Sequence, residues 1–235
     1  MPIAKAMILT RSLLLFAAAL IARPAAALSP QWVFEHASPS VAAIYAIDAS
    51  HKIVGRGSGV FVTKNLLITN CHVVGRGSSY LVGQAQKRSP ARLVAYDADR
   101  DLCMLKAEQF EGKAATIANA STLRIGQRVY AIGTPEEFQL TLSEGLISGL
   151  RETSSGRYIQ TTAPLSEGSS GGGLFDTRGR LIGITSFVFA PGQNLGFAAP
   201  AEWASALAKK AAAAGDASVE LPEIMTRQWR FPEFK

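Results

Sequence analysis

The sequence predicts an all-β protein, a sandwich or barrel, with one short helix before the β region and one helix after it. Between residue 40 and about residue 199, short runs rich in β-branched and aromatic residues alternate with glycine. Turn residues recur about every 8–12 residues between these runs, a spacing typical of all-β sandwiches and barrels. With 48% hydrophobic residues, the chain can fill one sizeable core or two small fused ones.

The predicted strands follow one another without a visible internal repeat. Their expected ranges are residues 41–47, 59–63, 66–70, 91–96, 102–106, 128–132, 146–151, 158–161, 173–175, 181–187 and 196–198. Residues 109–123 carry no strand pattern, so we expect them to connect two halves of the β region.

Two helices flank the β region. Ser29 followed by Pro30 is typical of an N-cap and a first helical position, which predicts a helix over residues 30–37. Helical periodicity returns at residues 200–214, and Gly215 stands where a C-terminal cap is expected. We assign no role to the polar tail at residues 216–235.

The N-terminus has the layout of a secretory signal peptide. Lys5 and Arg11 lead into an apolar run at residues 13–22, and small residues follow at 25–27. A permanent anchor is the weaker alternative, because a membrane span takes about 20 apolar residues. We expect cleavage after Ala27, so that residues 1–27 are removed, and export to the periplasm or the exterior without a stable membrane anchor.

The charge distribution argues against a nucleic-acid partner. The formal net charge is +6, and residues 1–27 contribute basic residues only, so the exported chain would carry about +3. Phosphate binding requires a basic run or a basic patch interleaved with aromatic residues, and the sequence shows neither. A solvated surface of mixed charge is the expectation.

His72 and Asp101 stand at the ends of two predicted strands. His72 closely follows the apolar strand at 66–70, and Asp101 directly precedes the apolar strand at 102–106. Each has a structural alternative when taken alone, because strand-end histidines are more often structural and an aspartate at a strand start is often a cap.

Ser170 lies in a glycine-rich turn, with Gly168 before it and three glycines after it. Glycines let the backbone turn tightly and approach a ligand closely. Such a turn can aim the amides of Gly168 and Ser170 at one point, as stabilisation of an oxyanion requires. A plain glycine-rich turn is the alternative. With His72 as base and Asp101 holding its tautomer, Ser170 would complete a catalytic triad.

The order of these residues separates two hydrolase families. The turn also fits the G-x-S-x-G motif of α/β-hydrolases, whose histidine follows the serine. Here His36, His51 and His72 all precede Ser170, so that fold would have no base. The order His, Asp, Ser agrees with the chymotrypsin type.

The chain resembles the trypsin-like peptidases, most closely the protease domain of the HtrA/Deg family, over roughly residues 40–208. The resemblance rests on short motifs in the family's order: GSGVFV at 57–62, TNCHVV at 69–74, DLCMLK at 101–106, VYAIGTP at 129–135, GLISG at 145–149, IQT at 159–161, GSSGG at 168–172 and NLGFAAP at 194–200. It implies a protease domain at 28–215 with two perpendicular six-stranded β-barrels, at about 40–110 and 120–199, a catalytic cleft between them, and a C-terminal helix at 200–214.

The chain departs from the family pattern in three places, two of which carry expectations. Ser169 stands where the family usually has asparagine or aspartate, and Gly173 stands where it has proline. Without an acid at position 169, a freshly cut N-terminus has no buried partner, so we expect no activation by propeptide cleavage. Few residues follow Ala208, so we also expect no PDZ domain.

The resemblance also implies where the primary specificity pocket lies. Its expected lining is Pro164, Leu165, Thr185, Ser186, Phe187 and Gly196. None of these residues is acidic, and burial of an unpaired Lys or Arg side chain is costly. We therefore expect cleavage after small or medium apolar residues.

Cys71 adjoins His72, and Cys103 lies two residues after Asp101. If that histidine and that aspartate touch, the two thiols come close, and an oxidising compartment favours a disulfide. Two buried free thiols are the alternative. No further Cys or His stands at a recognisable ligand spacing, so we expect no metal and no other cofactor.

The functional expectation is an exported serine endopeptidase that cuts unfolded or damaged polypeptides after small or medium apolar residues. A catalytically silent protease fold that serves as a binding or chaperone module is one alternative. Esterase activity on the same barrels is another, because acyl transfer does not demand an amide. The sequence predicts no oligomeric state.

Overall fold

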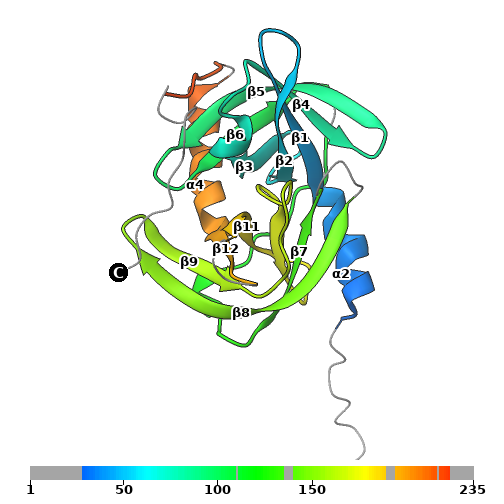
Figure 1. Ribbon diagram of the computed structural model, residues 1–235, viewed down its shortest axis with the longest axis vertical. Coiled ribbons are helices and arrows are strands. Elements are labelled where there is room, and N and C mark those ends of the chain that lie inside the picture. Colours follow the sequence, from blue (N-terminus) through cyan, green and yellow to red (C-terminus); the bar gives the residue numbers. More distant parts are fainter. Residues whose placement is uncertain (1–27, 110, 135–139, 189–193, 216, 223–235) are drawn as a thin grey trace, which may run out of the picture.

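The protein forms two closed six-stranded antiparallel β-barrels, seen in the computed structural model of Figure 1. The structure describes residues 28–109, 111–134, 140–188, 194–215 and 217–222. The expected all-β architecture of two six-stranded barrels is thus confirmed. The predicted signal peptide and its cleavage site lie outside the described residues, as does most of the tail at 216–235.

The first barrel has the strand order β1-β2-β3-β6-β5-β4. Its strands are β1 (Val41–Ile47), β2 (Ile53–Phe61), β3 (Leu66–Asn70), β4 (Ser79–Gln84), β5 (Lys87–Asp97) and β6 (Leu102–Ala107). The short helix α3 (Cys71–Val74) follows β3 directly. Because Asn70 pairs with Leu102, the end of β3 lies beside the start of β6, which brings His72 and Asp101 to the same edge.

The second barrel has the strand order β10-β11-β12-β9-β8-β7. Its strands are β7 (Arg128–Gly133), β8 (Thr141–Thr153), β9 (Gly156–Thr161), β10 (Gly173–Asp176), β11 (Leu181–Val188) and β12 (Gly196–Pro200). Gly173 pairs with Ile184, so the turn that carries Ser170 lies beside the next residues of β11, Thr185 and Ser186.

Apolar side chains fill each barrel and also the contact between the barrels. The first barrel encloses Ile44, Phe61, Leu67 and Leu105, and the second encloses Val129, Ile147, Ile159 and Leu174. A third cluster joins residues of both barrels and includes Val60, Ile68, Tyr130 and Phe175. Burial of this shared cluster favours one fixed arrangement of the two barrels.

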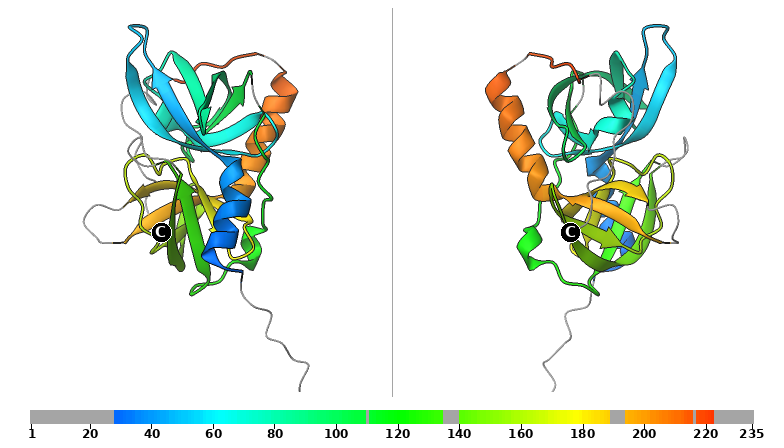
Figure 2. Two further views of the ribbon diagram at one scale, coloured as in Figure 1. Left: turned by 90° about the vertical axis from the view of Figure 1, so that its right-hand side faces the viewer. Right: turned by 60° about the vertical axis from the view of Figure 1, so that its left-hand side comes forward.

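The helices occur where the sequence predicts them. In α2 (Pro30–Ala37), the hydroxyl of Ser29 accepts the amide of Trp32 at 3.1 Å as an N-cap, and the 3-10 turn Ser38–Ser40 follows. Helix α4 (Ala201–Ala214) begins one residue later than expected and ends at Gly215, whose φ is +68°. In both views of Figure 2, the orange helix α4 lies beside the first barrel and its lower end reaches the second. Within the described residues, no helix is long and apolar enough to cross a membrane.

Four strands differ from the sequence-based expectation. Strand β4 was not expected, and β8 extends from Thr141 to Thr153 where only 146–151 was expected. Strand β2 begins at Ile53, not at residue 59, and β5 begins at Lys87, not at residue 91. Strands β4 and β8 contain glycine and polar residues, and both are fixed by pairing with neighbours on each side. The connection after β6 carries one 3-10 turn, Ala120–Thr122, and Ile117 bridges Leu181.

Candidate active site

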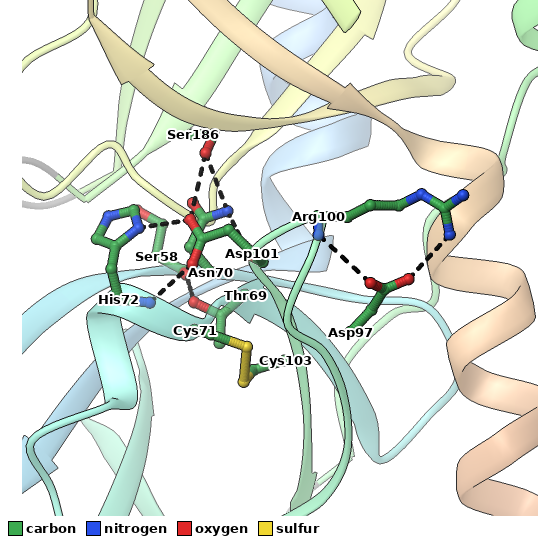
Figure 3. The surroundings of a disulfide bond; sticks show 10 residues. All are labelled: Ser58, Thr69, Asn70, Cys71, His72, Asp97, Arg100, Asp101, Cys103 and Ser186. Atoms are coloured by element: carbon green, nitrogen blue, oxygen red, sulfur yellow. Dashed lines mark hydrogen bonds and ion pairs between the residues drawn. A yellow bond between two sulfur atoms is a disulfide. The ribbon is translucent and has the colours of Figure 1, made fainter. Parts of the chain in front are cut away.

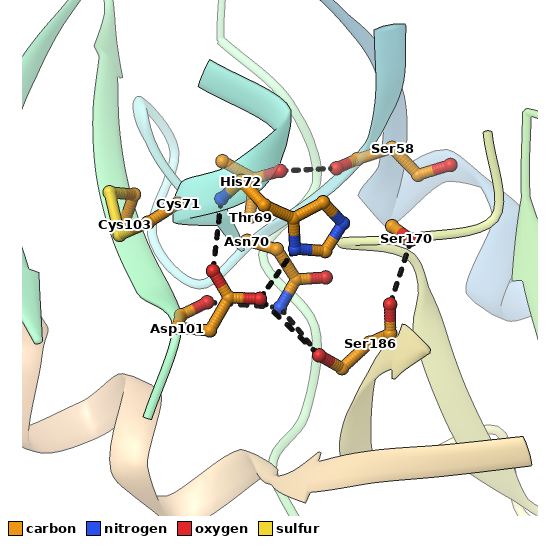
Figure 4. Close-up of polar contacts among 9 residues, drawn as sticks. All are labelled: Ser58, Thr69, Asn70, Cys71, His72, Asp101, Cys103, Ser170 and Ser186. Carbon is orange, nitrogen blue, oxygen red and sulfur yellow. Dashed lines mark hydrogen bonds and ion pairs between the residues drawn. A yellow bond between two sulfur atoms is a disulfide. The ribbon is translucent and has the colours of Figure 1, made fainter. Parts of the chain in front are cut away.

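The carboxylate of Asp101 holds His72 through two hydrogen bonds (Figure 4). Oδ1 accepts the His72 backbone amide at 2.9 Å, and Oδ2 lies 2.6 Å from Nδ1 of the ring. Because a carboxylate accepts hydrogen bonds, this contact favours the proton on Nδ1 and leaves Nε2 as an acceptor. That tautomer is the one a general base needs.

Asp101 is fully buried, and both its backbone amide and its backbone carbonyl are hydrogen-bonded. Its φ is +55°, in the left-handed region that non-glycine residues seldom adopt. Its carbonyl accepts the amide of Cys71 at 3.1 Å and the side chain of Asn70 at 3.0 Å. The hydroxyl of Ser186 lies 3.4 Å from Oδ2. Asn70 and Ser186 therefore support the acid, a role that the sequence analysis did not assign to them.

Arg100, the residue directly before Asp101, contacts both the second barrel and helix α4. Its Nη1 donates to the carboxylate of Asp97 at 2.9 Å, as Figure 3 shows, and its Nε donates to the Ser155 carbonyl at 3.0 Å. Its guanidinium lies 4.6 Å from the centre of the Trp203 ring. Trp203 in turn packs edge-on against Tyr158, a residue whose pKa is raised by burial and, secondly, by the charge of Asp101.

Cys71 and Cys103 form a disulfide, drawn in Figure 3. Their Cα atoms lie 4.9 Å apart on the adjacent segments that carry His72 and Asp101. The predicted disulfide is thus present, and the alternative of two free thiols does not apply.

The turn that carries Ser170 is built on left-handed glycines. Gly168 has a φ of +85° and Gly171 a φ of +83°. A Cβ at position 171 would overlap the carbonyl of Ser58, so only glycine fits where this turn meets the first barrel. The Ser58 amide donates to the carbonyl of Ser170 at 2.8 Å.

The hydroxyl of Ser170 donates to the carbonyl of Ser186 at 2.8 Å. A hydroxyl has one hydrogen to donate, so in this rotamer it is not given to His72. Figure 4 shows the second ring nitrogen of His72 on the side of Ser170. A rotation about the Cα–Cβ bond of Ser170 would redirect the hydroxyl from Ser186 to that nitrogen.

The backbone amides of Gly168 and Ser170 differ from their neighbours in the turn. Neighbouring amides are used within the fold: Ser169 donates to Ser166 at 3.0 Å, and Gly171 donates to Thr185 at 2.7 Å. For the amides of Gly168 and Ser170, no acceptor is found among the described residues. Two unused amides beside a serine hydroxyl suit the stabilisation of an oxyanion.

A pocket of about 300 Å³ opens beside Ser170. It is lined by Leu165, Ser166, Glu167, Ser169, Ser170, Thr185 and Ser186. Three of the residues expected in the specificity pocket are therefore together here, and Glu167 adds a carboxylate that the sequence analysis did not place.

The other expected pocket residues lie elsewhere or outside the description. Pro164 lines a smaller adjoining cavity of about 40 Å³. Gly196 lies against Leu165, whose side chain would be 2.8 Å from a Cβ at that position. Phe187 pairs through its backbone with Phe197, and its side chain lies outside the described residues.

Acidic, histidine and cysteine side chains do not gather into a metal site within the described part of the chain. The histidine and the aspartate at the centre of the site bind each other.

Comparison with known families identifies a peptidase domain in this chain. The model of the trypsin-like peptidase domain matches residues 57–184, which is more than half of the chain. The chain belongs to the trypsin-like peptidases. Its relatives are HtrA/Deg proteases. Protease Do-like 1, chloroplastic, of Arabidopsis thaliana is 32% identical over 194 residues, covering 72% of this chain and 44% of the relative.

Another relative is the periplasmic pH-dependent serine endoprotease DegQ of Escherichia coli. It is 32% identical over 168 residues, covering 66% of this chain and 37% of DegQ. This trypsin-like peptidase thus spans less than half the length of these curated relatives.

Solved structures of HtrA proteases have the same fold. The serine endoprotease from Yersinia pestis matches with a TM-score of 0.69 at 33% identity, covering 78% of this chain and 66% of that one. An HtrA-type protease solved with a tripeptide matches with a TM-score of 0.71 at 30% identity, covering 77% and 63%.

Proposed function

We propose that this trypsin-like peptidase is an exported serine endopeptidase in which Ser170 is the nucleophile, His72 the general base and Asp101 the orienting acid. The observation that carries the proposal is the 2.6 Å contact between Nδ1 of His72 and Oδ2 of Asp101, on the ring edge opposite to the Ser170 side. It leaves Nε2 to take the serine proton.

The proposed reaction proceeds in two halves. Ser170 rotates toward His72, gives its proton to Nε2 and attacks the scissile carbonyl, while the amides of Gly168 and Ser170 donate to the oxyanion. The imidazolium, stabilised by Asp101, then gives that proton to the leaving amine, and an acyl-enzyme forms. Water, deprotonated by His72, attacks the ester carbon and releases the acid and the free serine.

The proposed substrates are unfolded or damaged polypeptides, cut after small or medium apolar residues. Leu165 supplies apolar surface to the pocket of about 300 Å³ beside Ser170, and the carboxylate of Glu167 in the lining is exposed to solvent, so it is not a buried partner for a basic side chain. The periplasmic names of several relatives support export as part of this proposal.

The proposal is tested with the purified chain and its Ser170→Ala variant, incubated with unfolded casein and with a fluorophosphonate that labels activated serines. The wild type should cut casein and take the label, and Ser170→Ala should do neither. Ser121→Ala, which alters an exposed serine in the connection between the barrels, is the control and should behave as wild type. If no form of the chain cuts casein or takes the label, yet all prevent its aggregation, the binding or chaperone alternative replaces the proposal.

A further inference from the structure

The three carbonyls around the nucleophile are all held by hydrogen bonds. The Ser58 hydroxyl donates to the Gly168 carbonyl at 2.7 Å, and the Ser58 amide donates to the Ser170 carbonyl at 2.8 Å. The carbonyl between them, of Ser169, accepts the Thr185 hydroxyl at 2.6 Å and the Gly172 amide at 3.0 Å. One side chain from each barrel thus holds the turn.

The Ser58 hydroxyl is fixed in its direction. Ser58 is fully buried on β2, and its Oγ accepts the backbone amide of Thr134 at 2.8 Å. The Thr134 hydroxyl lies 3.2 Å away, but the Gly168 carbonyl at 2.7 Å is the nearer acceptor for the single hydroxyl hydrogen of Ser58. The distance of 2.7 Å is typical of a well-formed O–H···O bond.

Thr185 is held just as firmly from the second barrel. It is buried on β11, and its backbone exchanges two hydrogen bonds with the turn: its carbonyl accepts the Gly171 amide at 2.7 Å, and its amide donates to Gly172 at 2.9 Å. Its hydroxyl therefore reaches the Ser169 carbonyl from a rigid strand.

These contacts determine where the free amides point. In a planar trans peptide the C=O and the following N–H point in opposite directions. Fixing the Ser169 carbonyl on Thr185 therefore turns the Ser170 amide the other way. The Gly168 amide belongs to the preceding peptide, so the bond from Ser58 to the Gly168 carbonyl holds this amide through the backbone torsions of Gly168, whose φ is +85°.

We infer that Ser58 and Thr185 are positioning residues that hold the amides of Gly168 and Ser170 in place for the oxyanion. The inference rests on the proposed function, because it assigns the two hydroxyls to the same reaction. It also gives this chain a means of fixing the turn with Ser169 in place of the acid or amide usual at that position.

The test compares Ser58→Ala and Thr185→Val with two matched controls. Ser89→Ala removes a fully buried hydroxyl of the first barrel that donates to the Pro90 carbonyl at 2.9 Å. Thr153→Val removes a buried hydroxyl of the second barrel that donates to the Gly156 carbonyl at 2.7 Å. All four variants lose one buried hydroxyl-to-carbonyl bond, but only Ser58→Ala and Thr185→Val lose it at the turn that carries Ser170.

The readouts are kcat, KM and affinity for a peptide boronate, whose tetrahedral adduct places an oxygen where the oxyanion forms. Loss of a direct oxyanion donor costs about 10²–10³-fold in kcat, so misplacing donors should cost about 10–100-fold. We expect kcat and boronate affinity to fall together, with KM within about threefold, as for loss of a transition-state interaction. Thr185→Ser should keep the activity that Thr185→Val loses, because serine retains the hydroxyl.

Two outcomes would overturn the inference. One is that Ser58→Ala and Thr185→Val keep kcat and boronate affinity within about twofold of the two controls. The other is that kcat falls while boronate affinity does not. If Ser58→Ala fails to fold, the comparison of Thr185→Val with Thr185→Ser decides alone.

Failure of the proposed function is recognised separately, because the wild type would then be inactive. In that case the backbone amide resonances of Gly168 and Ser170 decide the inference by NMR. Shifts in Ser58→Ala and Thr185→Val that exceed those in the two controls support it, and unchanged resonances refute it.

Discussion

Ser58 donates its backbone amide to the carbonyl of Ser170 at 2.8 Å, across the boundary between the two barrels. Gly171 follows immediately with a φ of +83°, and a Cβ added to it would overlap the Ser58 carbonyl. The proposed nucleophile of the second barrel is therefore placed by contact with the barrel that carries His72 and Asp101.

Substitution of Gly171 by alanine should be severe. A left-handed alanine costs about 1–2 kcal/mol by itself, and here its Cβ would also overlap the Ser58 carbonyl and the Thr69 hydroxyl. We expect Gly171→Ala to lose activity and several kcal/mol of unfolding free energy, measured by urea denaturation. The control is Gly126→Ala, where φ is +85° and no atom lies within 4 Å of the added Cβ. Equal losses in the two variants would mean that the contact with Ser58 has no energetic weight.

Asp101→Asn should reduce kcat by about 10³–10⁴-fold, with KM little changed. An asparagine amide can present a hydrogen to the ring and so favours the wrong tautomer of His72. Steady-state kinetics on a peptide substrate measure the effect, and Asp99→Asn, an exposed acid in the same turn, serves as the control. A loss below tenfold would exclude an orienting role for Asp101.

Removal of the disulfide should destabilise the fold. In the chain-entropy model, closing a loop of 32 residues' separation stabilises by roughly 3–4 kcal/mol. The double variant Cys71→Ala/Cys103→Ala should lose about this much unfolding free energy in urea. A reductant should lower the midpoint of the wild type once alkylation shows both thiols free, but leave the double variant unchanged. A fully reduced wild type with the original midpoint would contradict the prediction.

Arg100→Lys should be destabilising although it keeps the positive charge. Lysine lacks the planar group that lies over Trp203 and bonds Ser155 and Asp97 together. We expect a loss of about 1–2 kcal/mol in urea denaturation. Arg128→Lys is the control, because Arg128 forms an exposed pair with Glu144 at 3.1 Å, and such pairs contribute about 0–1 kcal/mol. Similar losses at both positions would argue against the link to α4.

Glu167→Gln should change charge preference at the pocket. The exposed carboxylate of Glu167 lines the pocket beside Ser170, so we expect it to disfavour substrates with acidic residues there. A charge contact near 4 Å in water is worth about 1 kcal/mol, so the variant should cut peptides with Asp or Glu next to the cleavage site about threefold to fivefold faster. The cleavage rate of neutral peptides should not change. The control variant Glu152→Gln should cut all these peptides at the wild-type rate. A gain that persists undiminished in high salt would not be electrostatic.

The sequence predicted those parts of the fold that local chemistry encodes. Ser29 and Pro30 marked the start of α2, and the apolar run before His72 marked β3. Strand β4 escaped prediction because its Gly83 and Gln84 have low strand propensity, and only pairing with β1 and β5 fixes them.

The site was predictable where a motif names the residue and unpredictable where tertiary contact gives the role. The approach of His72 to Asp101 was expected from the order His, Asp, Ser and from the resemblance to trypsin-like peptidases, and the structure accounts for it by the pairing of Asn70 with Leu102. The contacts of Ser58 and Thr185 with the turn depend on how two barrels meet, and nothing in their local sequence shows it. The bond from Ser170 to Ser186 depends on one side-chain rotamer, which sequence patterns do not encode.

Helix α4 packs against β5 and β6 of one barrel and against β11 and β12 of the other, with Ala204, Leu207 and Ala211 buried on it. Opening the gap between the barrels would strip this helix from at least one of them. The two halves are therefore thermodynamically coupled, and heat should melt them in a single cooperative step rather than one after the other.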